Sequence, residues 1–145
     1  MENEFVTYDI ALAMKGLGFD EYCITYYGQE VEGGRLKFPP IVNPNNFNDL
    51  TLDIILAPTY QKAFRWFREE HLLVGSIGFD EDVKGKWGGS VTGHYETHGK
   101  FNLGFTGWFE TYQEAQDACL RKLIEIVKEK DQIDPNAMGS YNSPQ

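Results

Sequence analysis

The sequence has few cysteines, no long apolar run and a shortage of basic residues, and each of these shortages argues against a class of protein. Two cysteines are too few for the disulfide framework of a small secreted domain. No apolar run approaches the roughly 20 residues that a membrane-spanning helix needs. The 13 lysines and arginines against 22 acidic residues give a formal charge of −9, which disfavours binding to nucleic-acid backbones or anionic membranes.

The two cysteines and the first residues indicate where the protein works. Cys23 lies in a strand-like apolar pattern and Cys119 in a helical one, so we expect both to be small buried hydrophobes in a reducing compartment. The chain opens Met1-Glu2-Asn3-Glu4, which is acidic where a signal peptide would be basic. We therefore expect a cytosolic protein.

Catalytic and metal-binding signatures are also missing. The sequence has no Walker-type phosphate loop, no nucleophile elbow and no Cys/His protease pattern. His94 and His98 have a spacing seen at metal sites, but they lie in a predicted turn without a nearby cysteine. An acid and base pair could be built from residues 80–82 with either histidine, although adjacent acids in a turn are usually a solvated surface. We expect no metal, no cofactor and no catalysis.

The residues that are present favour a single α+β domain. Fifteen glycines and six prolines point to many turns, and the aromatic share of 14% is that of a globular protein. We predict an antiparallel sheet of about five strands with two or three helices packed on one face. This domain is expected to span residues 1–130, and residues 131–145 are expected to form a solvated tail.

The central element of the prediction is a helix over residues 57–71. Its apolar residues recur at the three- and four-residue spacing of one helix face, with Pro58 suited to the first turn. The predicted buried residues are Tyr60, Ala63, Phe64 and Phe67. A second long helix follows the capping box Thr111-Tyr112-Gln113-Glu114 and runs to Lys130 with a long apolar stripe.

Shorter patterns fill the rest of the chain. A short helix is predicted over residues 8–15, and strands are predicted over 22–27, 50–56, 72–79, 86–95 and 100–109. Gly33-Gly34 predicts a hairpin turn between residues 30–32 and 35–38. Residues 39–49 are rich in proline and asparagine, which indicates a long excursion that could act as a lid or a dimer arm.

Arginines and aromatic residues supply the candidate binding site. A nucleotide needs a flat apolar surface for its base and fixed cations for its phosphates. Arg65 and Arg68 lie on the side of the central helix away from the core, at the spacing that brings two guanidinium groups together. The predicted ligand-binding residues are Arg65, Trp66, Arg68, Lys86, Trp87, Tyr95 and Trp108. The alternatives are that both arginines pair with Glu69, Glu70 or nearby acids, and that the tryptophans belong to the core or an interface.

The order of these patterns resembles small accessory proteins of bacteriophages and prophages. The residues that carry the resemblance are Ala57-Pro58-Thr59-Tyr60-Gln61-Lys62-Ala63-Phe64-Arg65-Trp66-Phe67-Arg68 and Thr111-Tyr112-Gln113-Glu114-Ala115, the latter leading into Leu123-Ile124-Glu125. The resemblance covers the chain up to about Lys130 and implies a phage accessory role without a settled catalytic motif. Phages also encode compact oligomeric proteins that sequester nucleotide immune signals, although no motif is shared with them position by position.

Taken with the binding residues, the resemblance leads to a specific expectation. We expect a phage-encoded binding protein, forming a homo-oligomer in the cytoplasm of the infected bacterium. Its ligand would be a nucleotide-derived immune signal, of the cyclic ADP-ribose type or a cyclic dinucleotide. No membrane or long nucleic acid would be a partner. The alternatives are a module that inhibits a host protein through its aromatic surface, and a phosphodiesterase that cleaves the signal.

Overall fold

The structure is a computed structural model that describes residues 2–28, 36–37, 54–83 and 86–131. The helices are α1 (Tyr8–Gly16), α3 (Tyr60–His71), α4 (Tyr95–His98) and α5 (Tyr112–Asp131), with short 3-10 turns η1 (Glu2–Glu4) and η2 (Glu81–Val83). The strands are β1 (Tyr26–Gly28), β2 (Leu36–Lys37), β3 (Ile54–Leu56), β4 (Leu73–Asp80), β5 (Lys86–Gly93) and β6 (Asn102–Phe109).

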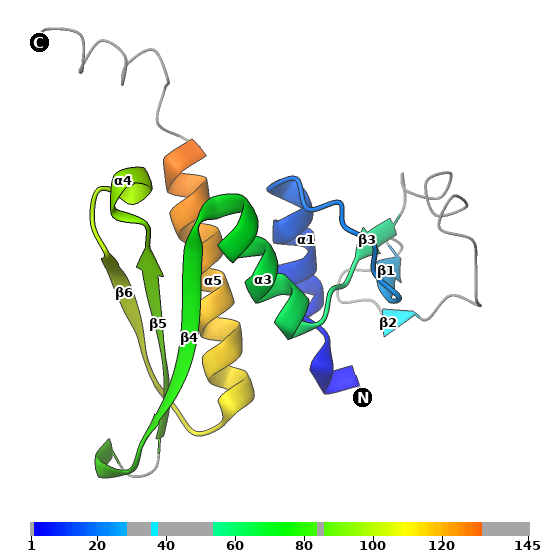
Figure 1. Cartoon of the computed structure of the whole chain (residues 1–145). Coiled ribbons are helices and arrows are strands. Elements are labelled where there is room, and N and C mark those ends of the chain that lie inside the picture. The colour runs from blue at the N-terminus through cyan, green and yellow to red at the C-terminus, as the bar shows by residue number, and fades with distance from the viewer. Residues whose placement is uncertain (1, 29–35, 38–53, 84–85, 132–145) are drawn as a thin grey trace, which may run out of the picture.

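The predicted α+β class is confirmed, but the strands do not form one sheet. Within the described residues they form two three-stranded antiparallel sheets, ordered β2-β1-β3 and β4-β5-β6. β3 leads through Ala57 and Pro58 into α3, and α3 leads directly into β4. The three longer helices, α1, α3 and α5, lie between the two sheets, whereas α4 joins β5 to β6 at one end of the larger sheet, as Figure 1 shows.

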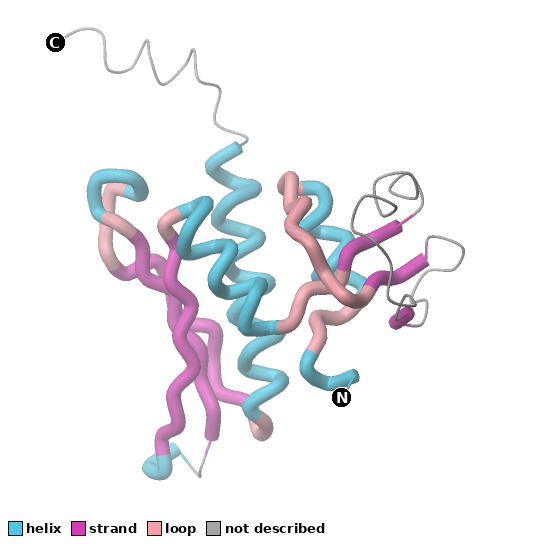
Figure 2. The backbone as a smooth tube through the Cα atoms, turned by 45° about the vertical axis from the view of Figure 1, so that its right-hand side comes forward, coloured by secondary structure: helices cyan, strands magenta, loops and turns pink. Residues whose placement is uncertain are grey.

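The larger sheet is the meander that the sequence predicts. β4 and β5 pair along their whole length, from Leu73 opposite Gly93 to Asp80 opposite Lys86. β6 pairs with the other edge of β5, with two irregularities in register. α3 and α5 cover one face of this sheet, and no described element lies on the other face in Figure 1 or Figure 2.

The central helix begins three residues later than predicted. Thr59 is its N-cap, because its hydroxyl accepts a hydrogen bond from the Lys62 amide at 3.1 Å. Pro58 therefore precedes the helix instead of lying in its first turn. The predicted buried face is confirmed: Tyr60, Ala63, Phe64 and Phe67 are all buried.

The last helix begins where the capping box places it. The Glu114 amide donates to the Thr111 hydroxyl at 3.1 Å, and that hydroxyl donates to the Glu114 carboxylate at 2.8 Å. The apolar stripe of α5 faces the core, with Ala115, Cys119 and Leu123 fully buried. Together with α3 it makes the helical layer on the β4–β5–β6 sheet.

The core extends from the β4–β5–β6 sheet past α5, α3 and α1 to the β2–β1–β3 sheet. Its fully buried members include Val6, Ile10, Met14, Ile55, Ala57, Ala63, Phe67, Leu73, Val91, Cys119, Leu120 and Leu123. Cys23 and Cys119 are both buried free thiols, as predicted. Burial raises the pKa of the Cys23 thiol to about 12 and that of Cys119 to about 11.

Some predicted boundaries are wrong, and others lie outside the described residues. The strand predicted over 22–27 begins only at Tyr26, and the strand predicted over 86–95 ends at Gly93, because Tyr95 opens α4. Outside the described residues lie the Gly33-Gly34 turn, the 39–49 excursion, most of the 50–56 strand and the tail after Asp131. No helix of the described part is long and apolar enough to cross a membrane.

Candidate functional site

Arg65 and Arg68 are both exposed on α3, on the side away from its buried face. Neither guanidinium makes an ion pair or hydrogen bond with another described residue. The alternative that they pair with Glu69 or Glu70 is therefore not observed. Both cations stay available to a ligand over the part of the chain that is described.

Arg68 lines a hollow where α3, β4 and α5 meet. Its volume is about 380 Å³, and its lining residues are Gln61, Phe64, Arg68, Gly75, Ile77, Tyr112 and Gln116. The apolar part comes from Phe64 and Ile77, while Arg68, Tyr112 and the two glutamines bring hydrogen-bonding groups from two helices. A cation surrounded by neutral donors suits an anionic oxygen more than it suits a cation.

The walls of the hollow are held by packing between α3 and α5. The Tyr60 hydroxyl, one residue before Gln61, donates to the Asp117 carboxylate, one residue after Gln116. Burial, followed by this bond to Asp117, raises the pKa of Tyr60. The bond therefore fixes the distance between the helix turns that carry Gln61 and Gln116.

A row of aromatic rings extends from the hollow along the end of the sheet. The rings of Tyr112 and Trp87 meet edge to face with centroids 5.1 Å apart. Trp87 in turn contacts Phe79, with centroids 4.9 Å apart. Tyr112 and Phe79 are exposed to 46% and 54%, so the row presents apolar surface beside the Arg68 hollow.

Trp66, one of the predicted ligand-binding residues, is not part of this surface and lies in the core. Its side chain is only 5% exposed, and its ring meets Phe19, Phe67 and His71 edge to face. Trp66 follows Arg65 directly, but the α1–β1 connection packs Phe19 onto that side of α3. The tryptophan therefore belongs to the core, which was the alternative interpretation.

The remaining predicted residues are scattered. Lys86 forms an ion pair with Glu110, and Trp108 lies on the sheet face that no described helix covers. Tyr95 is 68% exposed, but it opens α4 at the opposite end of the sheet from the β4–β5 turn. Of the predicted residues, Arg68 lines the hollow and Trp87 contacts the lining residue Tyr112. The lining residues do not include Arg65, Trp66, Lys86, Tyr95 or Trp108.

The described residues do not assemble the acid and base pair considered for a phosphodiesterase. Residues 80–82 lie at one end of the β4–β5 hairpin and His94 at the other, roughly 23 Å away over seven strand residues. The His98 ring bonds to the backbone carbonyl of His71 at 2.8 Å. No group of three or more metal-ligating side chains is found within the described ranges.

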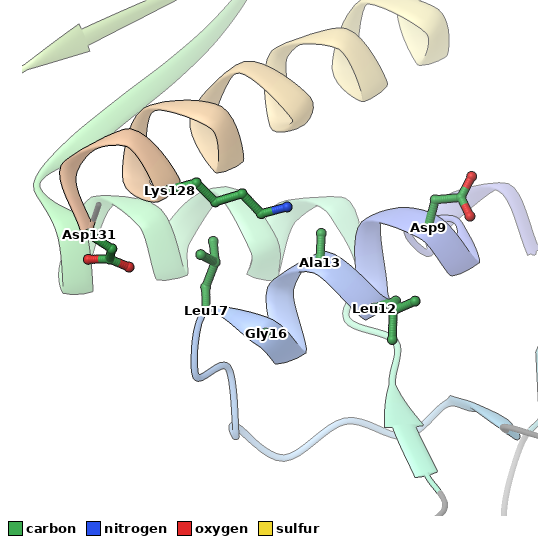
Figure 3. A pocket seen from close by; sticks show the side chains of 7 residues that line it. All are labelled: Asp9, Leu12, Ala13, Gly16, Leu17, Lys128 and Asp131. Carbon is green, nitrogen blue, oxygen red and sulfur yellow. The ribbon is translucent and has the colours of Figure 1, made fainter. Parts of the chain in front are cut away.

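A second groove runs between α1 and the C-terminal half of α5. Figure 3 shows Lys128 of α5 reaching toward Ala13 of α1, with Asp131 and Asp9 at either side. Its two adjoining hollows measure about 580 and 450 Å³. Their charged lining residues are Asp9, Arg121, Glu125, Lys128, Glu129 and Asp131. Four acids against two bases make this groove unsuited to an anion.

Sequence reasoning missed four members of the site: Gln61, Phe79, Tyr112 and Gln116. The helical spacing alone could have placed Gln61 beside Arg65 and Arg68, since it lies four and seven residues before them. Tyr112 and Gln116 could not be found in this way, because they reach the site only through the packing of α5 against α3. Phe79 and Trp87 are cross-strand neighbours, which requires the hairpin register.

Comparisons of the chain with protein families, with characterised proteins and with solved structures give no match.

Proposed function

We propose that the protein binds a small nucleotide-derived anion in the Arg68 hollow and releases it unchanged. The observation that carries the proposal is the arginine itself: Arg68 lines a hollow of about 380 Å³ and is unpaired among the described residues. A guanidinium binds phosphate oxygens through two parallel hydrogen bonds, which neutral side chains cannot replace. We therefore assign the ligand's phosphate to Arg68; Arg65 lies three residues earlier on α3 and is not among the residues that line the hollow.

The base of the nucleotide would stack on the aromatic row. Tyr112 borders the hollow and leads to Trp87 and Phe79, so a base that leaves the hollow meets ring surface. Stacking on one such ring contributes about 1–3 kcal/mol. The hollow is at the lower end of the roughly 300–1,000 Å³ typical of ligand sites, which favours a signal of the cyclic ADP-ribose type over a bulkier cyclic dinucleotide.

The charge of the chain is compatible with a ligand of this size. A net charge of −9 repels long polyanions, which must approach many acidic groups at once. Repulsion of a single nucleotide is screened beyond about 8–10 Å at cellular salt, so its binding depends on groups inside the hollow. The same charge distribution therefore selects small anions.

The biological setting of the proposal comes from the resemblance to phage accessory proteins. In this setting the protein is a phage-encoded homo-oligomer in the cytoplasm of the infected bacterium, and it sequesters an immune signal. It has no enzymatic activity and needs no cofactor. Binding without turnover is consistent with the separation of His94 from the acids at the far end of the hairpin.

Equilibrium dialysis with cyclic ADP-ribose, cyclic di-GMP and ADP tests the proposal. We expect the wild type to take up the first of these and to release it intact when the protein is heated. We expect Arg68→Ala to lose about tenfold or more in affinity, because hydrogen bonds to charged groups contribute about 1.5–3 kcal/mol. Arg68→Lys should recover only part of the lost affinity, since lysine restores the positive charge but not the planar group that donates two parallel hydrogen bonds.

Two results would contradict the proposal. Recovery of a chemically altered product would show that the protein is an enzyme. Failure to take up any of the three nucleotides would show that it does not bind a ligand of this class.

A second candidate function is supported by one separate observation. Phe105 and Trp108 are exposed to 54% and 41% on the sheet face that no described element covers. Such a surface fits a module that binds and inhibits a host protein. This alternative predicts no thermal shift with nucleotides and co-purification of one partner from the host.

A further inference from the structure

The face of the β4–β5–β6 sheet opposite the helices carries an unusual set of side chains. Strand alternation and the pairing register place Asp80 and Lys86 on this face at one end of the sheet, and nine further residues in three cross-strand rows. The rows are Val74, Thr92 and Asn102; Ser76, Ser90 and Phe105; and Gly78, Gly88 and Trp108. We name these nine residues the open face.

The assignment of sides follows from what a Cβ atom would meet at each glycine. A Cβ at Gly75 would lie against Phe64 and Cys119, so Gly75 faces the helices. A Cβ at Gly88 would lie 2.9 Å from both the Phe105 and Trp108 rings, so these three residues share the opposite side. The two rings contact each other with centroids 5.0 Å apart and lean over Gly88 on the central strand.

The open face is uncharged although the chain is strongly acidic. None of its nine residues is ionisable, whereas 35 of the 145 residues in the chain are charged, 13 basic and 22 acidic. Charged residues appear only in the next row, where Asp80 lies opposite Lys86 and Lys86 pairs with Glu110. A nucleic acid or an anionic lipid would require cations here, and the open face offers none.

The shape of the open face is complementary to the same face of a second copy of the chain. Phe105 and Trp108 form a ridge over β6 and β5, while Ser76 and Gly78 leave a bare lane on β4. A two-fold axis parallel to the strands would place the ridge of one copy over the lane of another, row by row. Two stacked sheets lie about 10 Å apart, and their strand directions differ by about 30°. The charged row at the end of one sheet would therefore be displaced sideways from the same row of the other sheet.

We propose that the open face is the interface of a homodimer in which two β4–β5–β6 sheets stack around a two-fold axis. Two chains of charge −9 repel each other, and contact through the open face adds no like charges in direct apposition, since none of its nine residues is ionisable. The open face would then be the contact surface of the homo-oligomer in the proposed function. Formation of this dimer does not depend on whether the ligand binds.

The size of the open face sets the expected strength of the dimer. The three rows run over five residues of β4, from Val74 to Gly78, and over three strands, so the open face projects an area of roughly 240 Å² per copy. Interfaces that bury under about 1,200 Å² in total are at the weak end of specific contacts. The dimer should therefore dissociate on dilution, and added salt should strengthen it because salt screens the repulsion between the two acidic chains.

Sedimentation velocity between about 1 and 500 µM tests the interface. We expect the wild-type sedimentation coefficient to rise from the monomer to the dimer value across this range. Phe105→Lys and Gly78→Lys should remain monomeric throughout. Gly78→Lys is the cleaner variant, because nothing lies within 4 Å of the added Cβ and the folded monomer can accept it.

Ile24→Lys is the matched control. Ile24 is 54% exposed, as Phe105 is, and lies outside the open face, so the same added charge should leave the dimer intact. Circular dichroism confirms that each variant is folded. Nucleotide dialysis on the same variants separates the two proposals, since loss of the dimer with retained uptake leaves the ligand site standing.

The inference is overturned if the wild type stays monomeric at every concentration. A dimer that survives both lysine substitutions on the open face would also overturn it, as would a monomer that binds a different protein through Phe105 and Trp108.

Discussion

The two faces of the β4–β5–β6 sheet carry different side chains and have different roles. Along β4, Leu73 and Ile77 point toward α3 and α5, whereas Val74 and Ser76 point away from them. Leu73 is fully buried, while its neighbour Val74 is 39% exposed. One strand therefore supplies both the core and a surface, and the alternation of side chains separates them.

The glycines of β4 show the same contrast. Gly75 is required by packing, because a Cβ there would lie 2.7 Å from the Phe64 ring and 2.9 Å from the Cys119 sulfur. At Gly78, three residues later, a Cβ would meet nothing within 4 Å. Glycine therefore allows a helix to approach the strand closely at Gly75, whereas at Gly78 it leaves an exposed surface without a side chain.

The largest expected difference between the faces comes from two neighbouring truncations. Leu73→Ala should lower the free energy of unfolding by about 2–5 kcal/mol, because it leaves a cavity under α3. Val74→Ala should cost less than about 1 kcal/mol, since its side chain is already partly in water. Urea unfolding measures both. Equal losses would show that the open face is covered in the monomer.

The paired glycines provide the next test. Gly75→Ala should cost about 1–3 kcal/mol through overpacking against Phe64 and Cys119. Gly78→Ala should change stability by no more than about 0.5 kcal/mol. The same unfolding experiment applies, at a concentration low enough to keep the chain monomeric. If Gly78→Ala were the more damaging change, the assignment of the two faces would be wrong.

Sequence reasoning recovered the parts of the fold that depend on local signals. The capping box at Thr111 and the apolar faces of α3 and α5 were predicted with the residues that the structure buries. The predicted single sheet was wrong, because nothing local shows that β1 pairs with β3 across a long separation while β4 starts a new sheet. Register between distant strands is a property of tertiary packing.

The candidate site was predicted less well for the same reason. Helical spacing correctly put Arg65 and Arg68 on the exposed side of α3. It could not show that Trp66 is covered by Phe19 from another segment, or that Tyr112 would close the hollow beside Arg68. Distances between residues in different elements decide which side chains share a site.

A smaller effect is expected from His71, at the end of α3 where the helical layer meets β4. Burial lowers the pKa of its ring, which lies edge to face against Trp66 at 4.8 Å. The unfolded chain therefore binds a proton more readily than the folded one, and stability should fall as the pH drops below about 6.5. His71→Gln should remove this part of the pH dependence.

Unfolding free energies of the wild type and His71→Gln at several values between about pH 5 and pH 7.5 measure this difference. The carboxylates titrate in both proteins, so their contribution cancels in the comparison. Parallel pH profiles would show that His71 is not buried in its neutral form.

The smallest perturbation compares thiol reactivity on the two faces. Cys119 lies under the helical layer with a pKa raised to about 11, so it should not react with a disulfide reagent at about pH 8 while the protein is folded. A Ser76→Cys variant places one thiol on the open face, where it should react as quickly as a free thiol at low micromolar concentration. Slow labelling of Ser76→Cys at high dilution would contradict an uncovered face.

One pair of variants tests whether the Arg68 hollow binds the proposed nucleotide-derived anion. Arg68→Ala and Arg121→Ala each remove an exposed arginine, but Arg121 lies in the acidic groove between α1 and α5. Calorimetric titration with cyclic ADP-ribose should give a loss of about tenfold or more for Arg68→Ala and wild-type affinity for Arg121→Ala. Equal affinities for the two variants would place the ligand elsewhere and contradict the account.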